Sequence, residues 1–217
     1  NIQSCLDYKF NRTNQMMVLC INEALNRAGV TLDFLKQNRV GVCIGTTSAN
    51  LTCDLNFGKA FYKEEAGDFS PLTESLKNNP ATAIATYYDL NGPIISINNA
   101  CTSGTDAIGI ATSWLKQDLC DVVIAGGIDS VLEDIYAGFR SLGLISAHSP
   151  KPFDKNRDGL IIGEAVGIVL VESETSLKKR KGTQFCEILG YGLATDSFHP
   201  TTPHPEAKGL ALAVDQA

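Results

Sequence analysis

Cys101 lies where an apolar, strand-like run passes directly into a helix of small residues, in the stretch SINNACTSGTDAIGIA at 96–111. A thiol at a helix start lies beside unpaired backbone N–H groups and the positive end of the helix dipole, which stabilise a thiolate, the nucleophilic form. The small neighbours Ala100, Ser103 and Gly104 leave room for a substrate carbonyl, whose oxyanion a backbone N–H could stabilise. The spacing alone leaves two interpretations equally open: a cysteine nucleophile, or a small hydrophobe buried at a helix start.

The three histidines are weaker candidates for chemistry. His148 lies in the polar stretch SAHSP and His204 between two prolines, so both are expected in surface turns. For His199, in DSFH, a role in holding its loop is favoured over direct catalysis.

A metal site is not expected. The segment FDKNRDG places Asp154, Asn156 and Asp158 in alternation, with Gly159 at the sixth position of a calcium loop. The twelfth position is Ala165 instead of the closing glutamate, which favours an ordinary polar loop. The seven cysteines form no CxxC pair, so a zinc site is not indicated either.

Strand and helix signals alternate along the chain and would position Cys101. Continuously apolar strands alternating with helices are typical of a largely parallel sheet covered on both faces, so we expect one α/β domain over residues 1–217. The spacing leaves 46–79 undetermined. Helices are expected at 13–28, 80–90, 101–117, 131–142 and 174–181, and again from 206 onward; strands are expected at 39–45, 94–98, 121–127 and 185–195, with a further long apolar run at 160–173.

Composition excludes several classes of function. A net charge of −6 argues against nucleic-acid binding, and the basic run 178–181 before Gly182 is typical of a solvated helix end. No apolar run approaches the ~20 residues of a membrane span. Scattered, unpaired cysteines are typical of a reducing compartment, so a cytoplasmic location is expected.

Several motifs carry a resemblance to one family. NACTSG at 99–104, followed by KPFDKNRDGLIIGEAVGIVLVE at 151–172, resembles the β-ketoacyl-acyl-carrier-protein synthases, condensing enzymes of the thiolase-like fold. VVIAGGIDS, GFRSLGLIS and ATDSFHPTTPHPEAKG resemble further family segments in the same order. The resemblance runs from about residue 13 to the last residue and is poor over 46–79. It implies the N-terminal half of a layered α-β-α fold, without the family's first strand and C-terminal half.

The resemblance implies roles for particular residues. Cys101 would accept an acyl chain from a carrier-protein thioester, and a carbanion from decarboxylating malonyl-carrier protein would then attack it. Phe139 resembles a residue that lines the acyl tunnel. Thr201 and Thr202 would offer hydroxyls to a phosphopantetheine arm. Two histidines and a lysine would follow in the C-terminal half, so residues 1–217 alone are expected to be inactive.

The resemblance also implies partners, and it leaves alternatives. No cofactor is expected beyond the phosphopantetheine of the acyl carrier protein, and the strand before Cys101 would pair across the two-fold axis of a homodimer. One alternative is a non-catalytic, chain-length-determining partner subunit, although such partners typically lack the cysteine. Another is a thiolase-like enzyme that uses coenzyme A thioesters, which FDKNRDG disfavours. Fatty-acid and polyketide pathways remain open.

Overall fold

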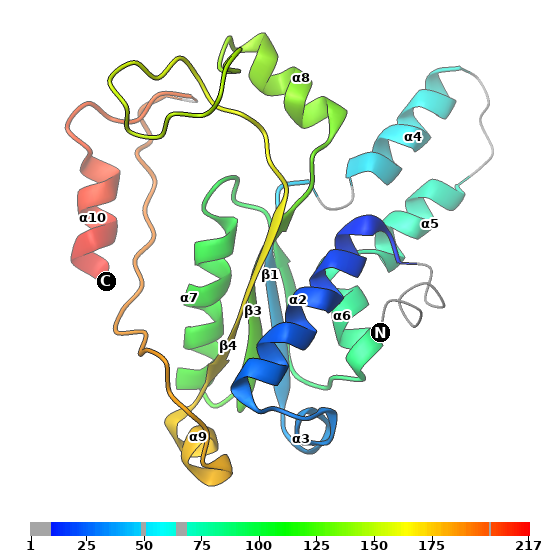
Figure 1. Ribbon diagram of the computed structural model, residues 1–217, viewed down its shortest axis with the longest axis vertical. Coiled ribbons are helices and arrows are strands. Elements are labelled where there is room, and N and C mark those ends of the chain that lie inside the picture. The colour runs from blue at the N-terminus through cyan, green and yellow to red at the C-terminus, as the bar shows by residue number, and fades with distance from the viewer. Residues whose placement is uncertain (1–9, 49–50, 64–68, 200) are drawn as a thin grey trace.

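The chain is built on a four-stranded mixed sheet in a computed structural model that describes residues 10–48, 51–63, 69–199 and 201–217. The strands lie in the order β2-β1-β3-β4, with β2 and β3 parallel to β1 and β4 antiparallel to β3 (Figure 1). The largely parallel sheet is therefore confirmed for three strands. Their bounds are β1 Val40–Gly45, β2 Ile94–Ile97, β3 Val122–Asp129 and β4 Ala165–Glu172.

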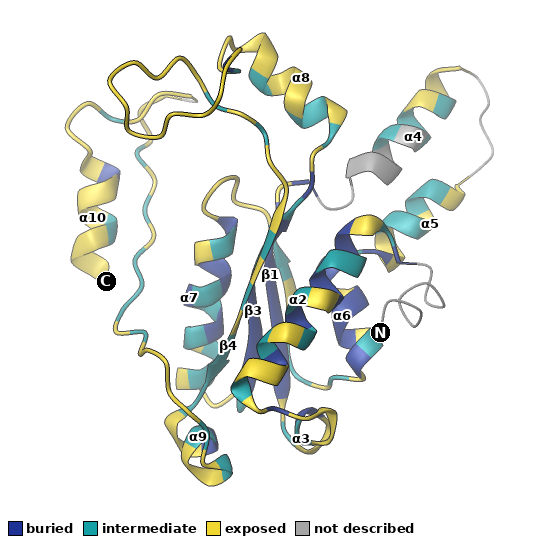
Figure 2. Cartoon of the chain, viewed as in Figure 1, coloured by how far each residue is buried: buried dark blue, intermediate teal, exposed yellow. Residues whose placement is uncertain are grey.

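Helices cover both faces of this sheet. On one face, α2 (Arg12–Ala28) and α6 (Pro80–Tyr88) pack over β1, β2, β3 and β4; on the other, α7 (Ser103–Lys116) packs over β1 and β3. Side chains alternate along β1, so Val42 and Ile44 join the α2 and α6 core whereas Cys43 joins the α7 core. The central strands are accordingly the most buried part of the molecule (Figure 2). This is the layered α-β-α arrangement that the sequence indicates.

The remaining described helices lie around this framework. The two helices α4 and α5 fall in the stretch 46–79 and pack against each other (Figure 1). In the described ranges, every helix falls short of the length or apolarity that a membrane crossing requires. The remaining bounds are α3 Leu32–Gln37, α4 Leu51–Tyr62, α5 Ser70–Lys77, α8 Glu133–Ser141, α9 Glu174–Arg180 and α10 Lys208–Gln216.

The predicted strand at 185–195 is wrong. This segment joins no strand of the sheet and instead runs beside α7, where the ring of Tyr191 lies over Gly109. A Cβ at position 109 would overlap that ring, so Gly109 makes room for the Tyr191 side chain. The long apolar run at 160–173 becomes a strand only from Ala165 onward.

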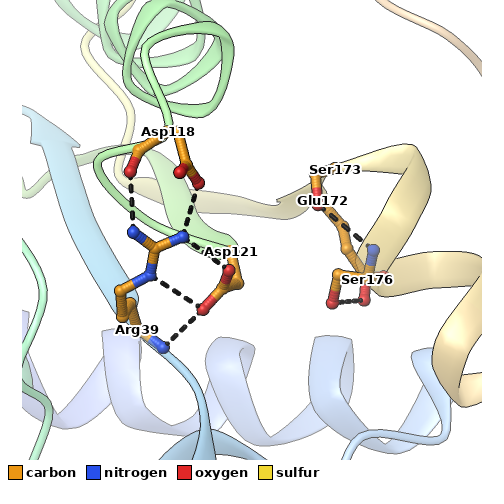
Figure 3. A network of polar contacts seen from close by, with 6 residues as sticks. All are labelled: Arg39, Asp118, Asp121, Glu172, Ser173 and Ser176. Atoms are coloured by element: carbon orange, nitrogen blue, oxygen red, sulfur yellow. Dashed lines mark hydrogen bonds and ion pairs between the residues drawn. The ribbon is translucent and has the colours of Figure 1, made fainter.

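The basic run at 178–181 is only partly a solvated helix end. Lys181, not Gly182, takes the left-handed position after α9, with φ +57°. Arg180 turns inward and forms an ion pair with Glu172 of β4, which also accepts a hydrogen bond from Ser176 (the Glu172–Ser176 contact is drawn in Figure 3). One cation of the run thus serves the tertiary structure, because it ties α9 to the sheet.

A second ion-pair network fixes the connection between α7 and β3. The guanidinium of Arg39, just before β1, donates to the carboxylates of Asp118 and Asp121 and to the carbonyl of Asp118 (Figure 3). The backbone N–H of Arg39 also donates to Asp121. The network holds the end of α7 to the start of β1. It lies at the amino ends of the parallel strands, whereas Cys101 follows the carboxyl end of β2.

Candidate active site

Cys101 is exposed in the tight turn that joins β2 to α7. The helix begins at Ser103 with Thr102 as its N-cap, two residues later than the sequence predicts. Ala100, immediately before the thiol, has φ +48°, in the left-handed region that L-residues other than glycine rarely adopt. The cysteine therefore lies at the handover from strand to helix, on a turn whose conformation its surroundings must enforce.

Glycines let this turn lie directly on the sheet. A Cβ at Gly45, the last residue of β1, would overlap the carbonyl group of Ser103. The first turn of α7 can approach β1 so closely only because position 45 carries no side chain. Gly127 of β3 meets Gly104 in the same way, since a Cβ there would lie 3.3 Å from the Cα of Gly104. These contacts place the turn that carries Cys101 at the carboxyl ends of the parallel strands.

The turn uses its own N–H groups more fully than the sequence suggests. The N–H groups of Thr102 and Ser103 donate to the carbonyls of Asn99 and Ala100 at 3.3 Å and 3.2 Å. The hydroxyl of Ser103 donates to the Ala100 carbonyl and accepts from the Asn99 N–H. The expectation of several unpaired N–H groups around Cys101 is corrected for these two, because the sharp turn brings carbonyls within their reach.

Asp106, in the first turn of α7, is the group that sequence reasoning missed. Its side chain is buried, with the residue only 4% exposed, and it accepts hydrogen bonds from Asn99 Nδ2 and the Tyr191 hydroxyl, each at 2.7 Å. The Thr102 hydroxyl lies 2.9 Å from the same carboxylate. Burial acts to raise the pKa of Asp106, but the hydrogen bonds from Tyr191, Asn99 and Thr102 together hold that pKa below its ordinary value.

A carboxylate at the end of β3 holds the neighbouring loop. Asp129 Oδ1 accepts from the N–H groups of Thr47 and Ser48 and from the Ser48 hydroxyl, all within 2.9 Å. The Thr47 hydroxyl in turn donates to the carbonyl of Ala100 at 3.3 Å. The loop after β1 is thus fastened to β3 and to the turn that carries Cys101.

The other predicted site residues lie on separate elements. Phe139 is half-buried in α8. This helix follows the carboxyl end of β3, and the Cys101 turn follows the carboxyl end of β2, so both lie beyond the same end of the parallel strands. Thr201 and Thr202 are exposed before α10, and the Thr201 N–H donates to Nδ1 of His199. The hydrogen bonds of this turn stay local, which agrees with the loop-holding role expected for His199.

The remaining polar candidates also make local contacts. His148 is exposed, and the Asp158 carboxylate accepts from Ser146 while that of Asp154 accepts from the Asn156 N–H. In the part of the chain that the structure describes, no group of three histidine, cysteine or acidic side chains lies close enough to hold a metal ion.

The comparisons with known proteins agree with this arrangement. The family model described as the N-terminal domain of beta-ketoacyl synthase matches residues 8–176. The chain is 35% identical to a putative mitochondrial 3-oxoacyl-[acyl-carrier-protein] synthase of Schizosaccharomyces pombe, over 94% of this chain and 50% of that protein. It is 27% identical to the ketoacyl synthase alpha subunit of the tetracenomycin polyketide synthase of Streptomyces glaucescens, over 96% of this chain and 52% of that one.

A solved structure shares the fold. A beta-ketoacyl synthase from Burkholderia phymatum STM815 superposes with a TM-score of 0.84 and 28% identity, over 97% of this chain and 54% of that one. The thiolase-like α/β fold is therefore confirmed, and the chain spans about half the length of these relatives. Because the family model matches more than half of its residues, the chain belongs to the beta-ketoacyl synthase family.

Proposed function

We propose that the protein carrying this chain forms carbon–carbon bonds by decarboxylative condensation, with Cys101 as its nucleophile. The observation that carries the proposal is the exposed thiol on a left-handed turn at the start of α7, within the segment that the family model matches. Such a turn presents a side chain outward from the sheet edge while small neighbours leave room for a substrate.

The chemistry proceeds in two stages. The Cys101 thiolate attacks the carbonyl of an acyl thioester, a new C–S bond forms, and the carrier leaves as a thiol after it takes a proton. A malonyl thioester then loses carbon dioxide, its carbanion attacks the acyl group on Cys101, and the cysteine is released as a thiolate. Covalent catalysis suits this sequence because it frees the carrier site for the second substrate. By the family resemblance, two histidines and a lysine of the C-terminal half assist the decarboxylation.

Acyl carrier protein is the proposed partner, and the phosphopantetheine that it bears is the only prosthetic group required. The Schizosaccharomyces pombe relative is a putative 3-oxoacyl-[acyl-carrier-protein] synthase, which supports a carrier protein as acyl donor here. Thr201 and Thr202 would receive the phosphopantetheine arm, and their exposure is compatible with that role. Phe139 would line the acyl chain's path, since α8 lies at the sheet edge that carries Cys101.

A homodimer is the proposed assembly. Strand β2 lies at the edge of the sheet, pairs only with β1 among the described strands, and leaves Ile94 44% and Ile95 38% exposed. An apolar edge strand of this kind is suited to pairing with a second copy.

The five described cysteines are all free, which supports a reducing compartment such as the cytoplasm.

The test compares two exposed cysteines. The full-length protein is incubated with a labelled acyl thioester of acyl carrier protein, and the acylated cysteine is located by peptide mass spectrometry. Cys101→Ala is expected to abolish labelling, whereas the matched variant Cys186→Ala retains it, because only Cys101 lies on the turn at α7. Equal labelling of wild type and Cys101→Ala would falsify the proposal. Labelling only by coenzyme A thioesters would favour the thiolase-like alternative instead.

A further inference from the structure

Asp106 is a buried carboxylate for which the proposed chemistry has no use. It lies in the first turn of α7, five residues after Cys101, and its two oxygens receive donors from two separate parts of the chain. Burying a charged group costs free energy unless the group is hydrogen-bonded. The hydrogen bonds that Asp106 accepts must therefore offset the loss of its hydration.

The donors to Asp106 come from both sides of the nucleophile. Asn99 precedes Cys101 by two residues and donates its side-chain amide; Thr102 follows Cys101, and its hydroxyl lies 2.9 Å from Oδ2. The other oxygen accepts from Tyr191, which belongs to the segment 185–195 that runs beside α7. The Asp106 carboxylate thus connects the residues on either side of Cys101 to the segment 185–195.

We propose that Asp106, held by Tyr191, is a positioning residue that fixes the turn carrying Cys101 in its reactive geometry. The inference rests on the proposed function, because it concerns the alignment of that nucleophile with a thioester carbonyl. It assigns Asp106 no proton transfer and no contact with substrate.

The strained backbone explains why the turn needs this anchor. Ala100 has φ +48°, a conformation that persists only where surrounding contacts enforce it. Without the carboxylate, the Asn99 amide loses its acceptor and the Thr102 hydroxyl keeps only the Asn99 carbonyl, at 2.9 Å, so the turn can relax toward ordinary φ values. Nucleophilic attack on a carbonyl depends steeply on geometry, since a displacement of about 1 Å can cost about a hundredfold in rate.

Tyr191 is well suited to hold the anchor. Burial and the neighbouring Asp106 raise the pKa of its hydroxyl to about 12, so the group stays protonated and keeps donating at neutral pH. Gly109 leaves room for the ring against α7, three residues along the helix from Asp106. The segment 185–195 thus holds Asp106 in place through the hydrogen bond from Tyr191.

The experiment follows three reactions at two cysteines of the full-length protein, Cys101 and Cys43. Acylation of Cys101 by an acyl-carrier-protein thioester reports alignment, and its alkylation by iodoacetamide reports simple access. Alkylation of Cys43 reports detachment of α7, because that thiol is fully buried under the helix and burial raises its pKa to about 12. The variants are Asp106→Asn and Tyr191→Phe, together with the matched pair Thr102→Ser and Thr102→Val, which keeps or removes the hydroxyl.

Positioning predicts a specific pattern. Acylation should slow about tenfold in Asp106→Asn, which corresponds to about 1.4 kcal/mol, and about threefold in Tyr191→Phe and Thr102→Val. Thr102→Ser should restore the wild-type rate, alkylation of Cys101 should change less than about twofold, and Cys43 should stay protected. If Asp106→Asn does not fold, the other three variants carry the test.

Two results would overturn the inference alone. One is acylation at wild-type rates in every variant, and the other is acylation lost only in parallel with alkylation of Cys43, which would make the role purely structural. A wild-type protein in which Cys101 is never acylated would overturn the proposed function as well.

Discussion

The ion pair between Arg180 and Glu172 gives the sharpest stability prediction. Their side chains are only 14% and 8% exposed, and the guanidinium donates from Nε and Nη2 to the carboxylate. Its Nη1 also donates to the carbonyl of Ala28, the last residue of α2. Arg180→Met therefore leaves a buried carboxylate without its counter-charge and a helix end without its cation.

The magnitude follows from this burial. Removing one partner of a buried ion pair costs about 3–5 kcal/mol, because the remaining charge keeps its desolvation penalty. Lys178 offers a matched control on the same helix, since it pairs with Glu174 but both side chains are about three-quarters exposed, at 73% and 76%. Lys178→Met should cost less than about 0.5 kcal/mol.

The assay is equilibrium unfolding in urea, with the free energy of unfolding compared at constant pH and salt. The double variant Glu172→Gln/Arg180→Met should recover at least about 1 kcal/mol relative to Arg180→Met, because it removes the orphaned charge. If Arg180→Met and Lys178→Met differ by less than about 0.5 kcal/mol, the reasoning from burial is refuted.

Two further predictions concern the framework. Gly45→Ala should lower the free energy of unfolding by about 1–3 kcal/mol, because its Cβ would overlap the backbone of Ser103. The control Gly138→Ala, whose Cβ would enter open space on α8, should be neutral or stabilising. Equal urea midpoints for the two variants would contradict this reasoning. The pKa of Asp121 lies below its ordinary value, chiefly because Arg39 donates hydrogen bonds to it. The pair therefore stabilises the fold at pH values above the pKa that Asp121 has in the unfolded chain. This stabilisation is lost as the pH falls through the lower pKa that Asp121 has in the folded protein. Unfolding free energies measured below about pH 4 should therefore fall less steeply in Arg39→Met than in wild type, and parallel curves would count against the pair.

Local sequence signals predicted the elements around Cys101 closely. The strand at 94–98 and the helix after Cys101 both occur, because apolar runs and small-residue helices leave a clear pattern over a few residues. The strand expected at 121–127 also occurs, but it continues beyond its two glycines to Asp129. The close approach of Gly45 and Gly127 to the first turn of α7 was not predicted, because it joins residues from three separate elements. The start of the helix was misplaced by two residues, since the turn hydrogen bonds of Thr102 and Ser103 decide it.

The segment 185–195 shows the limit of such reasoning. Its apolar, β-prone composition predicts a strand, yet the segment runs beside α7, where Tyr191 lies over Gly109 and donates to Asp106. These two residues lie 85 positions apart in the chain, so no local periodicity relates them. The inward turn of Arg180 escaped prediction for the same reason, because its partner and acceptor belong to β4 and α2.

The sequence by itself therefore determined which cysteine is the candidate nucleophile, the strand and helix that present it, and the family that its motifs resemble, because each is written in neighbouring residues. Only the tertiary structure decided what holds the turn that carries Cys101. Asp106, Tyr191 and Asp129 act through contacts that close when distant segments pack together, and long-range packing is the part of folding that local patterns leave unspecified.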